Sequence, residues 1–189
     1  FKKICYNKNT LKIYKKITEV LEMGFHEIKI QDFNLNPFTS TGKDWSLVTA
    51  GDENGINTMT VTWGMMGYLW RGPVISVYIR PTRYTKKFVD EQNCFSLSFF
   101  NGYKKELHVL GLKSGRDVDK IAEVGFNPIF LDGVPAFEEA KLVIVAEKLY
   151  IDDIKPENFI DKSIPEKLYT KEEPHIVYTG RVKKIYVKD

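Results

Sequence analysis

The chain has little sulfur and few metal ligands. It contains two cysteines, Cys5 and Cys94, which form no CxxC pair, and three histidines, His26, His108 and His175, which are far apart and outside any HExxH pattern. A disulfide framework and a zinc site are therefore not expected, and a reducing cytoplasm fits the composition best. No apolar run approaches the roughly 20 residues that cross a bilayer, so we expect no membrane association.

Several signatures of common enzyme classes are also missing. The sequence has no GxSxG elbow, no GxxxxGK[ST] phosphate loop and no GxGxxG fingerprint, which argues against α/β-hydrolase, P-loop and Rossmann folds. The net charge of +3 is small and the basic residues are interspersed with acidic ones. Nucleic acid is therefore not an expected partner, whereas a small anionic ligand is still allowed.

The composition that is present describes an ordinary globular protein. Hydrophobic residues make up 43% and charged residues 28% of 189 residues, which suits one domain with a packed core. Apolar residues at three- and four-residue steps after Thr10, ending at Gly24, predict a first helix. We therefore expect a single domain over 1–189, with a helical extension at 1–25 and the main body at 26–189.

Strand patterns dominate from residue 26 onward. Strands are predicted near Ile28 and Ile30, and then over 45–50, 57–63, 74–79, 95–99, 142–146 and 175–187. Helices are predicted over 85–91, 103–110 and 114–124, and the glycines and Pro73 between 64 and 73 predict a loop. Hairpins and short helices, rather than long alternating helices, favour a mostly-β antiparallel barrel with peripheral helices.

The segment from Arg80 to Thr85 is the strongest candidate for ligand binding. It follows an apolar strand and precedes a helix, and it holds Arg80, Arg83, Tyr84 and Thr85. Two guanidinium groups can grip a phosphate, while Thr85 and the free N–H groups of the helix add donors. The alternative is a solvated charged turn in which Thr85 only caps the helix, and from this segment alone that alternative is favoured.

The strand at 57–63 is unusually polar. Its residues include Asn57, Thr58, Met59, Thr60, Thr62 and Trp63, with threonine at every second position. Hydroxyl groups on one face and a terminal Trp can bind and flank a flat heteroaromatic ring. A half-exposed strand with threonines chosen for β-propensity explains the pattern equally well.

A third segment combines helix-start and anion-binding features. Ser114 and Asp117 have the spacing of a capping box, which predicts a helix beginning here. That role leaves Lys113 and Arg116 unexplained, and an anion contact at the helix N-terminus, made in the same or a neighbouring subunit, accounts for them.

Taken in order, these segments resemble the flavin reductase family, in particular its flavoredoxin-like branch with an FMN-binding split barrel. The similarity extends from about Trp45 to Val187 and includes GKDWSLVTAG, NTMTVTWG, VYIRPTRYT, FSLSFF, KSGRDVDK and HIVYTG. Two positions depart from the pattern expected of close relatives. Leu110 stands where we expect Cys, and Arg181 stands where we expect Glu, so the resemblance gives no support to thiol chemistry.

The resemblance implies a homodimer with FMN near its interface. The 57–63 strand would run along the isoalloxazine ring, and Arg80, Arg83 and Thr85 would hold the phosphate. Lys113, Ser114 and Arg116 would lie near the flavin, contributed by either subunit. The implied activity is transfer of hydride from NADH or NADPH to flavin N5, with the flavin supplying the chemistry.

Three alternatives stay open at this point. The first is an FMN-carrying electron-transfer protein that is reduced by a partner protein. The second is a pyridoxamine-phosphate-oxidase-like enzyme on the same barrel type, which the motifs make less favoured. The third is a barrel that has lost its ligand and serves as an interaction module, which the retained arginines and strand hydroxyls argue against.

Overall fold

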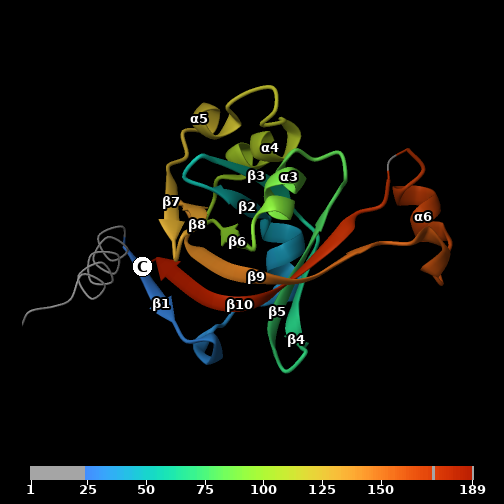
Figure 1. Cartoon of the computed structure of the whole chain (residues 1–189), viewed down its shortest axis with the longest axis horizontal. Helices are drawn as coiled ribbons and strands as arrows, with labels where there is room; N and C mark the ends of the chain where they lie inside the picture. The colour runs from blue at the N-terminus through green and yellow to red at the C-terminus, as the bar shows by residue number, and fades with distance from the viewer. Residues whose placement is uncertain (1–23, 172, 189) are drawn as a thin grey trace, which may run out of the picture.

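The computed structural model describes residues 24–171 and 173–188, and the helix predicted after Thr10 lies outside them except for Gly24. An antiparallel sheet forms the body of the molecule (Figure 1). Its strands are β1 (Phe25–Ile28), β2 (Ser46–Asp52), β3 (Gly55–Val61), β4 (Gly64–Leu69), β5 (Gly72–Ile79), β6 (Cys94–Phe99), β9 (Leu142–Asp153) and β10 (Ile176–Lys188). A separate hairpin consists of β7 (Pro128–Leu131) and β8 (Val134–Phe137).

The strands are ordered β3-β2-β6-β9-β10-β5-β4, with β1 also paired to β10. One edge of the long strand β10 is divided between two partners, because residues 176–181 pair with β5 and residues 185–188 pair with β1. Its other edge pairs with β9 through two register shifts. Such irregularities bend and twist strands, and Figure 1 shows β9 and β10 curving together across the molecule.

The near-continuous apolar run in β9 is buried on both faces, as its sequence predicts. Leu142, Ile144 and Ala146 pack into the cluster inside the curved sheet, while Val143 and Val145 pack into a second cluster beneath the β7–β8 hairpin and α4. Alternate side chains of a strand point to opposite faces, so a strand covered on both sides has no polar positions. The predicted mostly-β antiparallel class is confirmed.

Short helical segments join the strands. The α-helices are α2 (Pro37–Thr39), α3 (Thr85–Glu91), α4 (Lys104–Leu112), α5 (Lys120–Val124) and α6 (Ser163–Leu168), and the other helical turns are η1 (Ile30–Asp32), η2 (Ser40–Asp44) and η3 (Pro156–Asn158). Helices α3, α4 and α5 gather at one end of the sheet, and α6 lies at a protruding side (Figure 1). Within residues 24–171 and 173–188, no helix combines the length and the apolar character needed to span a membrane.

The prediction of a loop between residues 64 and 73 is wrong. Its first part is β4, which pairs antiparallel with β5 through a tight turn at Trp70 and Arg71. Both turn residues have positive φ, 51° and 63°, as a two-residue hairpin turn of the I′ kind requires. Because neither is the usual Asn or Gly, the sequence carried no hairpin signal.

The predicted start of the next helix at Ser114 is also wrong, because α5 begins at Lys120. The Ser114 side chain accepts from the backbone N–H of Arg116 at 3.2 Å, which makes a local turn instead of a capping box. Asp119 caps the helix, accepting from the Ala122 N–H at 3.1 Å. The predicted end at residue 124 is confirmed, and Gly125 follows it with φ of 70°.

Candidate functional site

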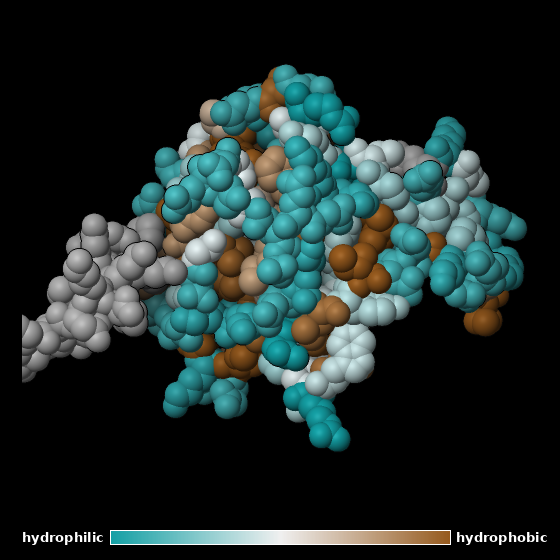
Figure 2. Space-filling model, in the orientation of Figure 1, coloured by the Kyte–Doolittle hydropathy of each residue, from teal (hydrophilic) through white to brown (hydrophobic). Residues whose placement is uncertain are grey.

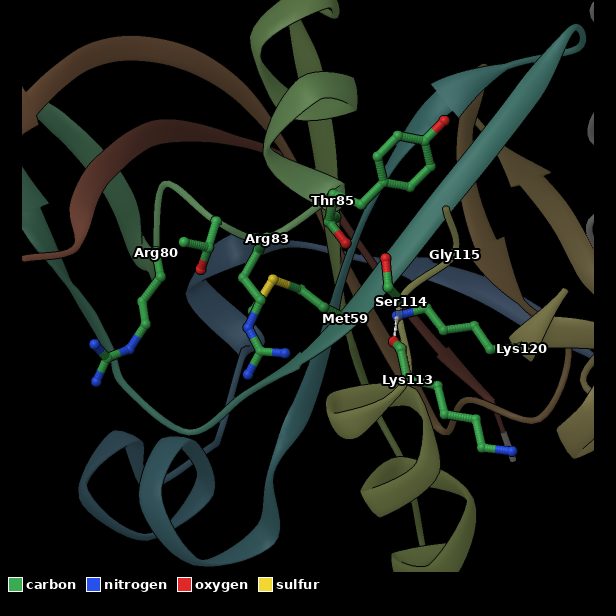
Figure 3. Close-up of a pocket in the computed structure, with 10 residues that line it drawn as sticks. Met59, Arg80, Arg83, Thr85, Lys113, Ser114, Gly115 and Lys120 are labelled. Atoms are coloured by element: carbon green, nitrogen blue, oxygen red, sulfur yellow. Dashed lines mark hydrogen bonds between the residues drawn. The ribbon is translucent and has the colours of Figure 1, made fainter. Parts of the chain in front are cut away.

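Two adjoining cavities hold most of the residues singled out in the sequence. We call the first the basic cavity; it has a volume of about 220 Å³. Its lining comes from β3, the 80–85 segment, the 113–115 segment and the start of α5 (Figure 3). The lining residues are Met59, Arg80, Thr82, Arg83, Tyr84, Thr85, Lys113, Ser114, Gly115 and Lys120.

The first wall is the turn between β5 and α3. The Arg83 N–H donates to the Arg80 carbonyl at 3.0 Å, which reverses the chain directly after the buried strand. This turn brings both half-buried arginines to the cavity. The Arg83 guanidinium donates through Nη1 to the carbonyl of Gly111 at 2.8 Å, and the Arg80 guanidinium lies 5.7 Å from the ring centre of Tyr169.

Thr85 is in the cavity wall but is almost fully buried, at 1% exposure. Its hydroxyl donates to the Oδ1 atom of Asn57 at 2.8 Å. A hydroxyl group has a single proton to donate, so in this arrangement Thr85 orients Asn57 instead of offering that proton to a ligand. The next two N–H groups of α3 are also engaged, because those of Lys86 and Lys87 donate to the carbonyls of Arg83 and Tyr84 at 3.0 and 3.2 Å.

The second wall is the segment 113–115, which passes very close to Asn57. A Cβ atom on Gly115 would lie 2.0 Å from the Asn57 Nδ2 atom. Only glycine lets the backbone approach this closely, and the approach brings Lys113 and Ser114 to the cavity. Lys113 also forms an ion pair with Glu123 of α5.

Lys120 lines the basic cavity although the sequence analysis did not select it. Its side chain is 4% exposed, and its ammonium group donates to the carbonyls of Leu110 at 2.8 Å and Lys113 at 3.0 Å. Burial, and secondarily the charge of Arg83, lowers its pKa to about 8. A signal was available, because a lysine in the first turn of a helix opposes the helix dipole and so requires another reason to be there.

We call the second cavity the strand cavity, because it follows the end of β3. It also has a volume of about 220 Å³ and shares Met59, Arg80 and Arg83 with the basic cavity. Its remaining lining residues are Thr60, Val61, Thr62, Trp63, Tyr78 and His175. Together the adjoining cavities reach the size range of small-molecule sites, roughly 300–1,000 Å³.

Aromatic side chains close one end of the strand cavity. The rings of Trp63 and His175 are 4.6 Å apart, and the Tyr169 hydroxyl lies 3.2 Å from Nδ1 of His175. His175 is nearly buried, at 9% exposure. Burial, reinforced by nearby Tyr169, raises the pKa of Tyr78 and keeps its hydroxyl protonated at neutral pH.

Three of the predicted site residues line neither cavity. Thr58 is fully buried, and its hydroxyl is bonded to Thr49 and to the carbonyl of Val48. Asn57 is buried and accepts the hydrogen bond from the Thr85 hydroxyl. Arg116 is exposed and lies 5.2 Å from the ring centre of Tyr84. Thr60 does line the strand cavity, and its hydroxyl donates to the carbonyl of Leu107 in α4.

The charges of the basic cavity define what it can bind. Arg80, Arg83, Lys113 and Lys120 line it, and none of its lining residues is acidic. Guanidinium and ammonium groups in this number suit a phosphate group. The strand cavity beside it offers Met59, Trp63 and Tyr78, whose apolar surfaces suit a flat ring. The pair fits a ligand that joins an aromatic ring system to a phosphate.

Residues 39–189 match the family described as flavin reductase like domain, and the chain belongs to that family. The resemblance noted in the sequence is thereby confirmed.

Solved structures agree on the fold. An FMN-binding protein from Thermus thermophilus, with bound 1-cyclohex-2-enone, is 25% identical and has a TM-score of 0.57, covering 85% of this chain and 76% of its own. The flavoredoxin of Desulfovibrio vulgaris (Miyazaki F) is 20% identical, with a TM-score of 0.61 and coverage of 87% and 78%. A protein with a split barrel domain from Shewanella frigidimarina is 15% identical, with a TM-score of 0.61 and coverage of 98% and 81%. The fold is therefore the split barrel. A separate comparison with curated proteins gave no match to the chain.

Proposed function

We propose that this protein binds FMN and acts as an NAD(P)H-dependent flavin reductase. The observation that carries the proposal is the basic cavity, which presents four cationic side chains without an acidic one and adjoins a cavity with aromatic walls. A chain of the flavin reductase-like family has a direct use for such a pair of cavities. The FMN-binding protein from Thermus thermophilus, at 25% identity, supports the choice of flavin.

The residues divide into two groups in this proposal. Arg80, Arg83 and Lys113 hold the phosphate. The end of β3 and the two residues that follow it, from Met59 to Trp63, lie along the ring system. Asn57 and Thr58 act behind this wall, through the buried hydrogen bonds described above.

A bound flavin would supply the redox chemistry, namely acceptance of hydride at N5 from a nicotinamide. The side chains orient and cover it. Trp63, which closes one end of the strand cavity together with His175, is 40% exposed and so offers ring surface to a second flat ring. His175 packs against Trp63 and, with Tyr169, restricts water at the same end of the cavity.

We further propose that the protein is a homodimer formed through the β4–β5 hairpin and the adjacent part of β9. Large hydrophobic side chains are exposed here, and Figure 2 shows hydrophobic atoms at the surface around this hairpin. They are Met65, Tyr68, Leu69, Trp70, Leu149, Tyr150 and Ile151. The ring of Trp70, in the turn of the hairpin, meets the ring of Tyr150 of β9 edge-to-face at 5.7 Å, so the hairpin and β9 adjoin here. Patches of this kind mark interaction sites.

The activity is tested by loading the protein with FMN, removing free flavin, and following the visible flavin band anaerobically after adding NADH or NADPH. Rapid bleaching by either nucleotide is the expected result, and it identifies the preferred donor. A band that persists with both nucleotides, while FMN stays bound, would instead support an electron carrier reduced by a partner protein. The flavoredoxin neighbour gives that second function its support.

A further inference from the structure

Lys120 is a buried cation in the wall of the basic cavity. It is the first residue of α5, it is 4% exposed, and Figure 3 shows its amino group directed toward the segment 113–115. Lysine is almost never fully buried unless it is paired. Its position therefore needs a compensating interaction or a ligand.

Both of its hydrogen bonds are made with backbone carbonyls. The Leu110 carbonyl, at 2.8 Å, belongs to the last turn of α4, and the Lys113 carbonyl, at 3.0 Å, follows that helix directly. The last carbonyls of a helix have no partner within it and carry its partial negative charge. Lys120 thus fastens the end of α4 to the segment that approaches Asn57 and lines the cavity.

The surroundings of Lys120 are strongly positive on the cavity side. Arg80 and Arg83, from the turn before α3, line the same cavity, as does Lys113 from the 113–115 segment. Two of the acidic groups nearest in sequence already have contacts, because Asp119 caps α5 and Glu123 pairs with Lys113. Arg116 and Asp117, both exposed, are the other charged groups of the loop.

We propose that Lys120 is a positioning residue of the phosphate site, which holds the segment 113–115 in place and takes up a proton when an anion binds. The proposal rests on the proposed function. An anion in the cavity faces Arg80, Arg83 and Lys113, and its charge favours the protonated form of Lys120 as well.

Because anion binding and protonation of Lys120 favour each other, the direction in which anion affinity changes with pH is fixed. Without ligand, the pKa of Lys120 is lowered to about 8, and a bound phosphate raises it. Below about pH 8 the ammonium is present in both states, so Lys120 adds no pH dependence there. Above that pH, binding must take up a proton, so affinity falls by up to about tenfold per pH unit. A phosphate monoester, with a second pKa of about 6, stays dianionic throughout this range.

The experiment measures the affinity of the flavin-free protein for FMN and for riboflavin, by fluorescence quenching, between about pH 6.5 and about pH 9.5. The expected result is a fall in FMN affinity above about pH 8 and a flat profile for riboflavin, which lacks the phosphate. The Lys120→Arg variant should lose the fall, because arginine stays protonated.

Lys148→Met is the matched control. Lys148 also donates to two carbonyls at a helix end, those of Val89 at 2.6 Å and Asp90 at 2.9 Å, and burial lowers its pKa, but it lines neither cavity. This variant should keep the wild-type pH profile.

Equal pH profiles for FMN and riboflavin in the wild-type protein would overturn the assignment, even if Lys120→Arg failed to fold. A fall that persists in a folded Lys120→Arg variant would overturn it as well. Absence of FMN binding at every pH would refute the proposed function instead. The role of Lys120 would then be decided by whether inorganic phosphate raises the melting temperature below about pH 8 and loses that effect above it.

Discussion

Gly115→Ala should destabilise the protein and damage the cavity wall, because the added methyl group has no space. Its Cβ atom would lie 2.0 Å from the Asn57 Nδ2 atom and 3.1 Å from Cγ. Asn57 cannot rotate away freely, since it is 5% exposed and accepts a hydrogen bond from the buried Thr85 at 2.8 Å. Either the 113–115 segment moves out or the Asn57–Thr85 bond breaks.

The size of the effect follows from those two costs. Overpacking of a buried contact costs about 1–3 kcal/mol, and loss of a buried hydrogen bond about 1 kcal/mol. The free energy of unfolding should therefore fall by roughly 2–4 kcal/mol. For a chain of this length each kcal/mol corresponds to about 2–4 °C, which predicts a fall in melting temperature of roughly 5–15 °C.

Calorimetry of the flavin-free variants measures this effect. Gly42→Ala is the control, because a Cβ atom on Gly42 meets nothing within 4 Å, and its melting temperature should stay near that of the wild type. In the Asn57→Ala background the obstacle is gone, so the further cost of Gly115→Ala should shrink to less than half. A melting temperature for Gly115→Ala within 2 °C of Gly42→Ala, or full additivity with Asn57→Ala, would refute this reasoning about the close approach.

Other substitutions test separate parts of the account. Arg80→Met should weaken FMN binding roughly tenfold to hundredfold by removing a charge-assisted contact, and an unchanged dissociation constant in fluorescence titrations would remove Arg80 from the site. Tyr68→Lys combined with Leu149→Lys should convert the dimer to a monomer in light scattering, because both side chains lie in the exposed patch; a persisting dimer would place the interface elsewhere. Without flavin, the free energy of unfolding of the wild type should rise by on the order of 2 kcal/mol relative to that of Lys120→Met as the pH goes from 8 to 10. The reason is that Lys120 loses its proton at a lower pH in the folded state than in the unfolded state. Parallel curves of unfolding free energy against pH for the two proteins would contradict this. Arg71→Gly should raise stability by about 0.5–1 kcal/mol by relieving its φ of 63°, and lower stability in denaturant titrations would show that the arginine side chain contributes more than the strain costs.

Much of the fold was visible in the sequence because its signals are local. The helix at Thr85–Glu91 is confirmed at both ends, and the apolar run at the start of β9 correctly indicated a strand buried on both faces. The failures occur where tertiary context decides. Trp70 and Arg71 are forced into a hairpin turn by the pairing of β4 with β5, and the helix start moved to Lys120 because Ser114 made a local turn.

The candidate site was predictable in part. Arg80, Arg83, Lys113 and Ser114 were selected from separate segments, and the structure brings them to one cavity. Their use for FMN stays a prediction, as does the assignment of residues 1–25 as an extension and of the cytoplasm as the location. Thr58 was selected for its alternation with Thr60, but pairing with β2 directs its hydroxyl to Thr49. Which threonines of this hairpin face the core depends on the rest of the sheet, and the local pattern does not show it.

The central claim is that the basic cavity recognises a flavin by its phosphate. The most direct test compares the affinities of the flavin-free protein for FMN and riboflavin at one pH near 7. Several charge-assisted contacts to one dianion predict that FMN binds roughly 100-fold more tightly or better, and that Arg80→Met narrows this difference. Equal affinities of the wild-type protein for the two flavins would contradict the account, because the cavity would then contribute nothing to recognition.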